Sequence, residues 1–450
     1  MPFEPKQPPK ATPRRRGLGL FWLGKLARVS VGLATFLIAL PIRACFGLAS
    51  SLRKVQRRDR IFAFLLLLAW MAIILSNFFL RGSYVFEGNL LVTEMSFTYT
   101  GYSEKRLLHP IYSARGLDLQ GSLTEPLFLR GGFYSDSDPM LNQMLNELDQ
   151  LSITFPYPTS RLIVTPIDES QPSQISIFEL NINPVTRVDQ LTYNSNEHQL
   201  SLCLLMATSP PKICIYPDSQ LANPAEADSE SIGQLRFKLG QQPLTMRLKL
   251  VDIPELDIQA DIDSPQELTF QLTPNNNNEL LIEPLSPTNL AISLPTFPEP
   301  TDVEAVNLPA WLRGDIDVAD VKFTRFDITE DVTDELKTST ILNGEVRMEQ
   351  ELMKVLANQF LIVQSETPGI RKIRDIQITS QPPKGLRTLI SGESKGIAVG
   401  LYPEFPVQSI EPSWLSKHLS QEAVNSLLAF IGALTAILLL PRLFPDPPSQ

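Results

Sequence analysis

An uncharged run of 20 residues, 61–80, constrains this chain more than any other feature of its sequence. At about 1.5 Å per residue, a helix of that length spans roughly 30 Å, the thickness of a bilayer's hydrocarbon core. A cleaved export signal has a shorter apolar region and a small-residue cleavage site, whereas this run is followed by Arg81 and Gly82. The sequence therefore predicts an uncleaved transmembrane helix within residues 57–82, in preference to a signal peptide or a buried core helix.

A second apolar segment, 423–440, has 18 residues without charge. Ser420 precedes it in a position suited to capping the helix, and Pro441 follows it where a helix must stop. This pattern predicts a second transmembrane helix within residues 419–441. The alternative is an amphipathic helix that docks on the folded part of the chain.

The charge distribution predicts the orientation of these helices. Residues 1–60 contain 13 basic and two acidic residues, a net charge of +11, whereas residues 61–420 carry −20. Because basic flanks stay on the cytoplasmic side, we expect an integral protein of the bacterial inner or plasma membrane. Both termini, including the short tail 442–450, would be cytoplasmic, and residues 83–418 extracytoplasmic.

The acidic balance of residues 83–418 also bears on partners. Nucleic-acid binding needs clustered lysine and arginine side chains that neutralise phosphates, so no nucleic-acid partner is expected. The expected partners are the lipid bilayer and a membrane or envelope protein.

The segment 17–56 is predicted to be an amphipathic helical segment in the membrane interface, where basic side chains face anionic headgroups. The alternative is a third span, which would place a basic cluster on the wrong side of the membrane. Residues 1–16, rich in proline and basic residues, are predicted to be a disordered basic tail. The basic residues expected at the interface are Lys25, Arg28, Arg43, Arg57, Arg58 and Arg60.

Alternation of apolar and polar residues dominates the region between the two apolar segments. The pattern predicts a mainly β fold: an antiparallel, sandwich-like extracytoplasmic region between an N-terminal and a C-terminal transmembrane helix. The segments 235–239 and 244–250 are predicted to pair as one hairpin, and 267–272 and 279–284 as another. Further strands are expected near 91–99, 160–166, 175–183, 199–206, 321–328, 359–364 and 374–380.

The 38 prolines of the chain suggest how this region is divided. Six prolines fall within residues 284–311, so 285–311 is predicted to be a proline-rich connector between a β-rich lobe, 83–284, and a second β-rich lobe, 312–418. An edge strand with proline-bearing turns is the alternative for the connector. One helix is expected near 138–151, because Asp138 is a candidate cap and leucine and methionine recur at helical spacing.

Cys203 and Cys214 are a candidate disulfide. A turn near 207–210 would bring the two residues opposite each other across a hairpin, at a separation that suits such a bond. An extracytoplasmic compartment would permit it. The alternative is two small buried thiols.

Catalytic patterns are weak throughout. The string GESKG places Ser394 in the spacing of a nucleophile elbow, but no helix-forming sequence follows it, as that motif requires. Acidic clusters at 136–138, 257–263 and 315–320 could hold Ca²⁺ or serve glycoside hydrolysis, but alternating aspartates are typical of a solvated strand face. We therefore assign no catalytic, cofactor-binding or metal-binding residue and expect no cofactor.

These patterns favour a non-enzymatic role: a membrane-anchored envelope scaffold, or an accessory subunit of a membrane or transport assembly. The alternatives are an enzyme that acts on envelope polysaccharide or lipid, and a module that binds a ligand between the two β lobes.

Overall fold

The computed structural model divides the chain into two units, Arg81–Lys417 and a second unit formed by Met1–Leu80 with His418–Gln450. In the first unit it describes residues 82–136, 139–168, 173–209, 230–275, 278–295, 311–327, 336–364, 369–379 and 382–412. In the second unit it describes isolated helical positions, among them Leu68 and Phe430, which are 52 % and 65 % exposed. The interfacial segment 17–56 and nearly all of both predicted spans lie outside the described residues.

Among the residues that the structure describes, no helix combines the length and the apolar character needed to cross a membrane.

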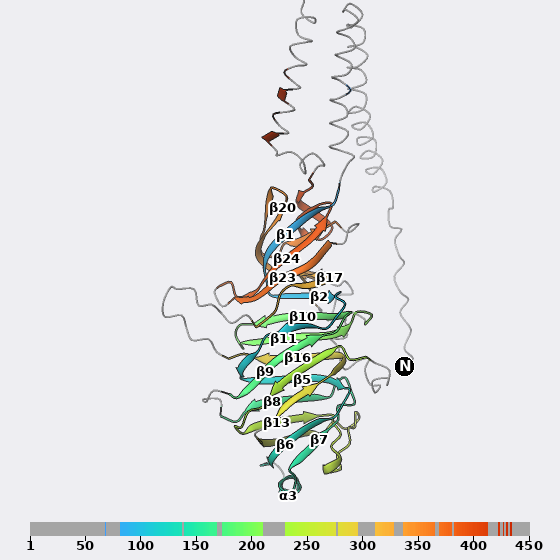
Figure 1. Cartoon of the computed structure of the whole chain (residues 1–450), viewed down its shortest axis with the longest axis vertical. Helices are drawn as coiled ribbons and strands as arrows, with labels where there is room; N and C mark the ends of the chain where they lie inside the picture. The colour runs from blue at the N-terminus through green and yellow to red at the C-terminus, as the bar shows by residue number, and fades with distance from the viewer. Residues whose placement is uncertain are drawn as a thin grey trace, which may run out of the picture. The chain divides into compact units, whose positions relative to one another are not determined.

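A large antiparallel sheet of 16 strands organises the described part of Arg81–Lys417 (Figure 1). Its strands follow one another in the order β21 (Glu351–Val355), β20 (Ile341–Met348), β1 (Tyr84–Val92), β24 (Gly385–Ser394), β23 (Gly369–Thr379), β17 (Ile316–Lys322), β2 (Glu94–Tyr99), β10 (Thr186–Asn194), β11 (Gln199–Met206), β16 (Pro284–Ser293), β5 (Gly116–Leu123), β8 (Arg161–Pro166), β13 (Leu244–Lys249), β14 (Glu267–Pro274), β6 (Leu127–Tyr134) and β7 (Gln150–Ile153). The predicted mainly β, antiparallel architecture is therefore confirmed.

A second antiparallel sheet packs on one face of the large sheet. It contains β15 (Glu279–Ile282), β12 (Gly233–Lys238), β9 (Ile175–Ile182) and β3 (Lys105–Leu108), and β4 (Ile111–Ala114) also pairs with β9. Buried residues of both sheets, such as Phe237 on β12 and Phe270 on β14, belong to one hydrophobic cluster. Because alternate residues of a strand point to opposite faces, the other face of β2 and β5 carries polar side chains such as Ser96, Thr98 and Gln120.

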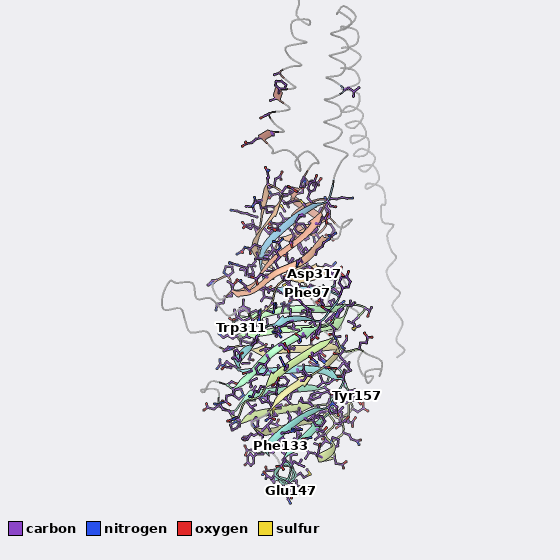
Figure 2. All side chains as sticks on the ribbon, viewed as in Figure 1. Phe97, Phe133, Glu147, Tyr157, Trp311 and Asp317 are labelled. Atoms are coloured by element: carbon purple, nitrogen blue, oxygen red, sulfur yellow. The ribbon has the colours of Figure 1, made fainter. Side chains whose placement is uncertain are left out.

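Smaller sheets complete this unit. The strands β22 (Phe360–Val363), β25 (Ile397–Tyr402) and β26 (Phe405–Ile410) form one of them, and β18 (Thr324–Asp327) pairs with β19 (Leu336–Ser339) in another. Ile397, Val399 and Ile410 of the three-stranded sheet join the same cluster as Phe86 and Leu90 of β1. Phe97 and Phe133, labelled in Figure 2, lie in the core at β2 and β6.

Both predicted hairpins are wrong, although all four strands are present. β12 pairs with β9 and β15, whereas β13 pairs with β8 and β14, so the chain between β12 and β13 crosses from one sheet to the other. In the same way β14 belongs to the large sheet and β15 to the smaller one. Gly240 has φ +78° in the first crossing, and a Cβ there would lie 2.2 Å from that of Gln174, which favours glycine.

Three further segments differ from the sequence expectations. The expected strand near 91–99 is two strands, β1 and β2, which break at Thr93 and pair with different neighbours. The expected helix near 138–151 is a shorter helix, α3 (Pro139–Asn146), because the chain enters β7 at Gln150. The first part of the expected connector is a strand, β16, and residues 296–310 lie outside the described residues.

Candidate functional site

A polar cavity of about 600 Å³ lies on the polar face of the large sheet. It crosses five adjacent strands of that sheet, β2, β10, β11, β16 and β5, and is also lined by β17 and β18. Its volume is within the range of small-molecule sites. The lining residues are Glu94, Ser96, Thr98, Asp118, Gln120, Arg187, Asp189, Gln190, Thr192, Ser201, Leu202, Ala207, Asn289, Leu290, Ala291, Asp320, Lys322, Thr324 and Arg325.

The strand register explains why these side chains meet. Asp189 on β10 is paired with Cys203 on β11, Cys203 with Asn289 on β16, and Asn289 with Gln120 on β5. Residues opposite each other in adjacent strands share a face of the sheet. One row of residues therefore runs across four strands, although its members are far apart in sequence.

Two β-bulges flank β2 and shape the floor of the cavity. The register between β2 and β10 shifts between Val188 and Leu191, and Gln190 has φ 51°. On the other side of β2, the register with β17 shifts between Ala319 and Lys322, and Asp320 has φ 52°. Bulges bend a strand, increase its twist and redirect side chains. Two bulges at the same level of one strand therefore account for a hollow in this part of the sheet face.

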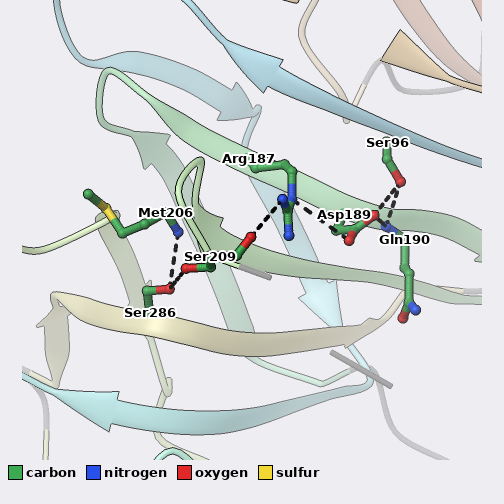
Figure 3. Close-up of polar contacts among 7 residues, drawn as sticks. All are labelled: Ser96, Arg187, Asp189, Gln190, Met206, Ser209 and Ser286. Atoms are coloured by element: carbon green, nitrogen blue, oxygen red, sulfur yellow. Dashed lines mark hydrogen bonds and ion pairs between the residues drawn. The ribbon is translucent and has the colours of Figure 1, made fainter. Parts of the chain in front are cut away.

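A hydrogen-bond network holds the β10 bulge in place (Figure 3). The Ser96 hydroxyl donates to Asp189 Oδ1 at 2.5 Å. The backbone N–H of Gln190 donates to the same carboxylate oxygen at 3.1 Å and to Ser96 Oγ at 3.2 Å. The Asp189 side chain is only 16 % exposed, so these bonds satisfy a carboxylate that burial would otherwise disfavour.

Arg187 is the basic counterpart of Asp189 on β10. Its Nε lies 3.9 Å from Asp189 Oδ2, and its Nη1 donates to the Ser209 carbonyl at 3.1 Å. Beside it, Ser286 Oγ accepts from the Met206 backbone N–H at 3.1 Å and lies 3.3 Å from Ser209 Oγ (Figure 3). The guanidinium thus has a fixed position at the wall of the cavity.

At the β5 end of the cavity, Asp118 is held by Arg161 of β8. The guanidinium makes two hydrogen bonds to the carboxylate, Nε to Oδ1 at 2.9 Å and Nη2 to Oδ2 at 2.5 Å. The bond to Asp118 is the largest cause of the raised pKa of Arg161. Because this pair is exposed, its contribution to stability is about 0–1 kcal/mol.

The chemistry of the lining suits binding. Four acidic and three basic side chains nearly balance, and eight more residues have hydroxyl or amide side chains. The lining contains no histidine or cysteine, and no group of side chains suited to a metal ion occurs among the described residues. The arrangement offers many fixed hydrogen-bond donors and acceptors, and the Ser96 hydroxyl that donates to Asp189 holds the β10 bulge without a histidine beside it in the lining.

The described candidate residues that the sequence suggested lie on different elements of the fold. Cys203 on β11 is 1 % exposed and forms a disulfide bond. Cys214 lies outside the described residues, so its pairing with Cys203 stays a prediction. Ser394 is fully buried at the end of β24 and donates to the Gly396 carbonyl at 2.7 Å, which is the contact of a structural turn.

Described aspartates of the acidic clusters form local contacts. Asp315 forms an ion pair with Lys372 at 2.7 Å, and that hydrogen bond lowers the pKa of the carboxyl. Asp261 accepts from the backbone N–H of Asp263 at 3.0 Å. Among the aspartates of these clusters that the structure describes, only Asp320 lines the cavity.

Sequence reasoning identified one of the cavity residues, Asp320, as part of the acidic cluster 315–320, and missed the others. They come from seven strands, and neither bulge has a glycine that would mark it, since Gln190 and Asp320 occupy the left-handed positions. The six basic residues expected at the membrane interface lie outside the described residues. In comparisons with known proteins, no family model, curated protein or solved structure matches the chain.

Proposed function

We propose that the chain is a membrane-anchored, non-enzymatic accessory protein whose β domain binds a polar ligand outside the cytoplasm. The observation that carries the proposal is the cavity at the paired bulges, because its side chains are fixed donors and acceptors and include no histidine or cysteine. The two apolar segments, 57–82 and 419–441, support anchoring at both ends of this domain. The basic N-terminal flank supports an extracytoplasmic location of residues 83–418.

Anchoring at both ends suits an accessory subunit of an envelope or transport assembly. Such an arrangement would restrict the domain to one membrane face, so that a ligand is held near a membrane partner. The hairpin β25–β26 supports a protein partner, because Tyr402, Phe405 and Val407 are 63–74 % exposed there, and exposed apolar side chains that cluster mark interaction surfaces.

Native mass spectrometry of the full-length chain, purified from its own membrane in mild detergent, tests the proposal. We expect a retained small molecule or a stable membrane partner, and no turnover of envelope glycans or lipids. Lys322→Gln, in the cavity, should reduce the retained ligand. Lys249→Gln, on the same sheet face outside the cavity, is the matched control and should not. Steady turnover of a glycan or lipid by the purified chain would contradict the proposal.

A further inference from the structure

The composition of the cavity lining narrows the class of ligand. Of the 19 lining residues, only Leu202, Ala207, Leu290 and Ala291 are apolar. An acyl chain needs a predominantly apolar pocket, so this lining does not suit a lipid tail. None of the 19 residues is aromatic, so the lining has no aromatic platform for stacking nucleobases.

The charges of the lining disfavour an ionic ligand. Two of the four carboxylates, Asp189 and Asp118, already have guanidinium partners in Arg187 and Arg161. Of the other charged side chains, Glu94 and Asp320 are acidic, and Lys322 and Arg325 are basic. A strongly anionic or cationic ligand would meet side chains of its own sign, whereas a neutral ligand would not.

The hydrogen-bonding pattern is that of a site for hydroxyl groups. A hydroxyl donates one hydrogen bond and accepts others, so it needs acceptors and donors side by side. The carboxylate of Asp189 next to the guanidinium of Arg187, with Asn289 on β16 and Gln120 on β5 farther along the cavity, provides that pairing. The row runs across several strands, which fits a ligand with many hydroxyls along its length.

We infer that the cavity binds a neutral, hydroxyl-rich saccharide chain, lying across strands β2, β10, β11, β16 and β5. This inference rests on the proposed binding function and names its ligand class. Recognition is by hydrogen bonds to the amide, hydroxyl and charged side chains that line the cavity. The saccharide is bound and not cleaved.

The test is isothermal calorimetry on the full-length chain in detergent. The probes are linear neutral oligosaccharides, a uronic-acid oligomer and a polar peptide of mixed charge. We expect a neutral oligosaccharide to bind.

Thr98→Val in the cavity should weaken that binding about tenfold, the effect of one lost hydrogen bond. Thr245→Val, on β13 outside the cavity, is the matched control and should leave it unchanged. Ser201→Ala is a second cavity variant in case Thr98→Val does not fold.

The outcomes separate the two proposals. Binding of the peptide or of the uronic-acid oligomer, without binding of any neutral oligosaccharide, overturns the ligand class and leaves the binding function. If the cavity variant and the control variant bind the oligosaccharide with equal affinity, the saccharide does not bind in this cavity. If the calorimeter cell contains shortened saccharide products, the chain cleaves saccharides. That result would contradict the non-enzymatic function, but the cavity would still be a saccharide site.

Discussion

Two stretches of the large sheet differ in the regularity of their strand register. Both show the same alternation of polar and apolar residues in the sequence, so the sequence does not reveal this difference. Around β2, bulges on β10 and β17 interrupt the register, and a cavity forms. Across β8, β13 and β14 the register is unbroken, and neither β13 nor β14 contributes a residue to that cavity. Both stretches are polar on one face and apolar on the other, so the irregular backbone, and not the polarity, distinguishes the candidate site.

The largest expected effect comes from the core beneath the two stretches. Phe97 on β2 and Phe270 on β14 are both almost fully buried. Truncation of either to alanine should lower the free energy of unfolding by about 3–5 kcal/mol, measured by urea denaturation with tryptophan fluorescence. Only Phe97→Ala should also weaken ligand binding, because β2 lies between the bulges. If Phe270→Ala weakened binding equally, the contrast between the two stretches would be lost.

The disulfide at Cys203 lies beside the irregular stretch, because Cys203 is paired with Asp189 of the bulged strand. If its partner is Cys214, the closed loop is short, and Cys203→Ser should lower the free energy of unfolding by about 2–4 kcal/mol. Alkylation without reductant, followed by mass spectrometry, should find Cys203 and Cys214 unmodified. Cys45→Ser is the control and should leave the stability unchanged. A modified Cys214 would exclude the predicted pair.

Removing one polar contact from each stretch should lower the free energy of unfolding by smaller and unequal amounts. Ser96→Ala removes the hydroxyl that donates to the largely buried Asp189 carboxylate. A hydrogen bond to a charged group is worth about 1.5–3 kcal/mol, so the urea midpoint should fall clearly. Arg161→Ala breaks the exposed pair with Asp118 and should cost about 0–1 kcal/mol. If Arg161→Ala lowered the free energy of unfolding more than Ser96→Ala does, the buried contact at the bulge would not be the stronger of the two.

The smallest expected effect concerns two tyrosines. Burial is the main cause of the raised pKa of Tyr99, at the end of β2, whereas the hydrogen bond to Asp136 is the main cause for Tyr134 on β6. Each neutral phenol favours the folded state below pH about 10, and this contribution is lost as the pH rises through the folded-state pKa. In an ultraviolet titration, Asp136→Asn should lower the pKa of Tyr134 and leave that of Tyr99 unchanged. Equal shifts would contradict these separate causes.

The sequence predicted the strands because alternation reports which face of a strand is buried. It did not predict their partners, since Leu235 and Phe237 alternate in the same way whether the next strand lies beside them or in the opposite sheet. The crossing at Gly240 therefore looked like a hairpin. The cavity was hidden for a related reason: Gln190 and Asp320 are common residues, and only tertiary pairing places them in left-handed backbone at a bulge.

The claim that the β domain faces away from the cytoplasm is tested most directly by labelling with a membrane-impermeant thiol reagent. Single cysteines at Ser83, at the fully exposed Tyr102 and at Ser449 would be introduced into a Cys45→Ser chain. With any outer barrier opened, intact cells should label positions 83 and 102, and position 449 should react only in inverted vesicles. Labelling of position 102 only in inverted vesicles would contradict the account, because the binding domain would then lie in the cytoplasm.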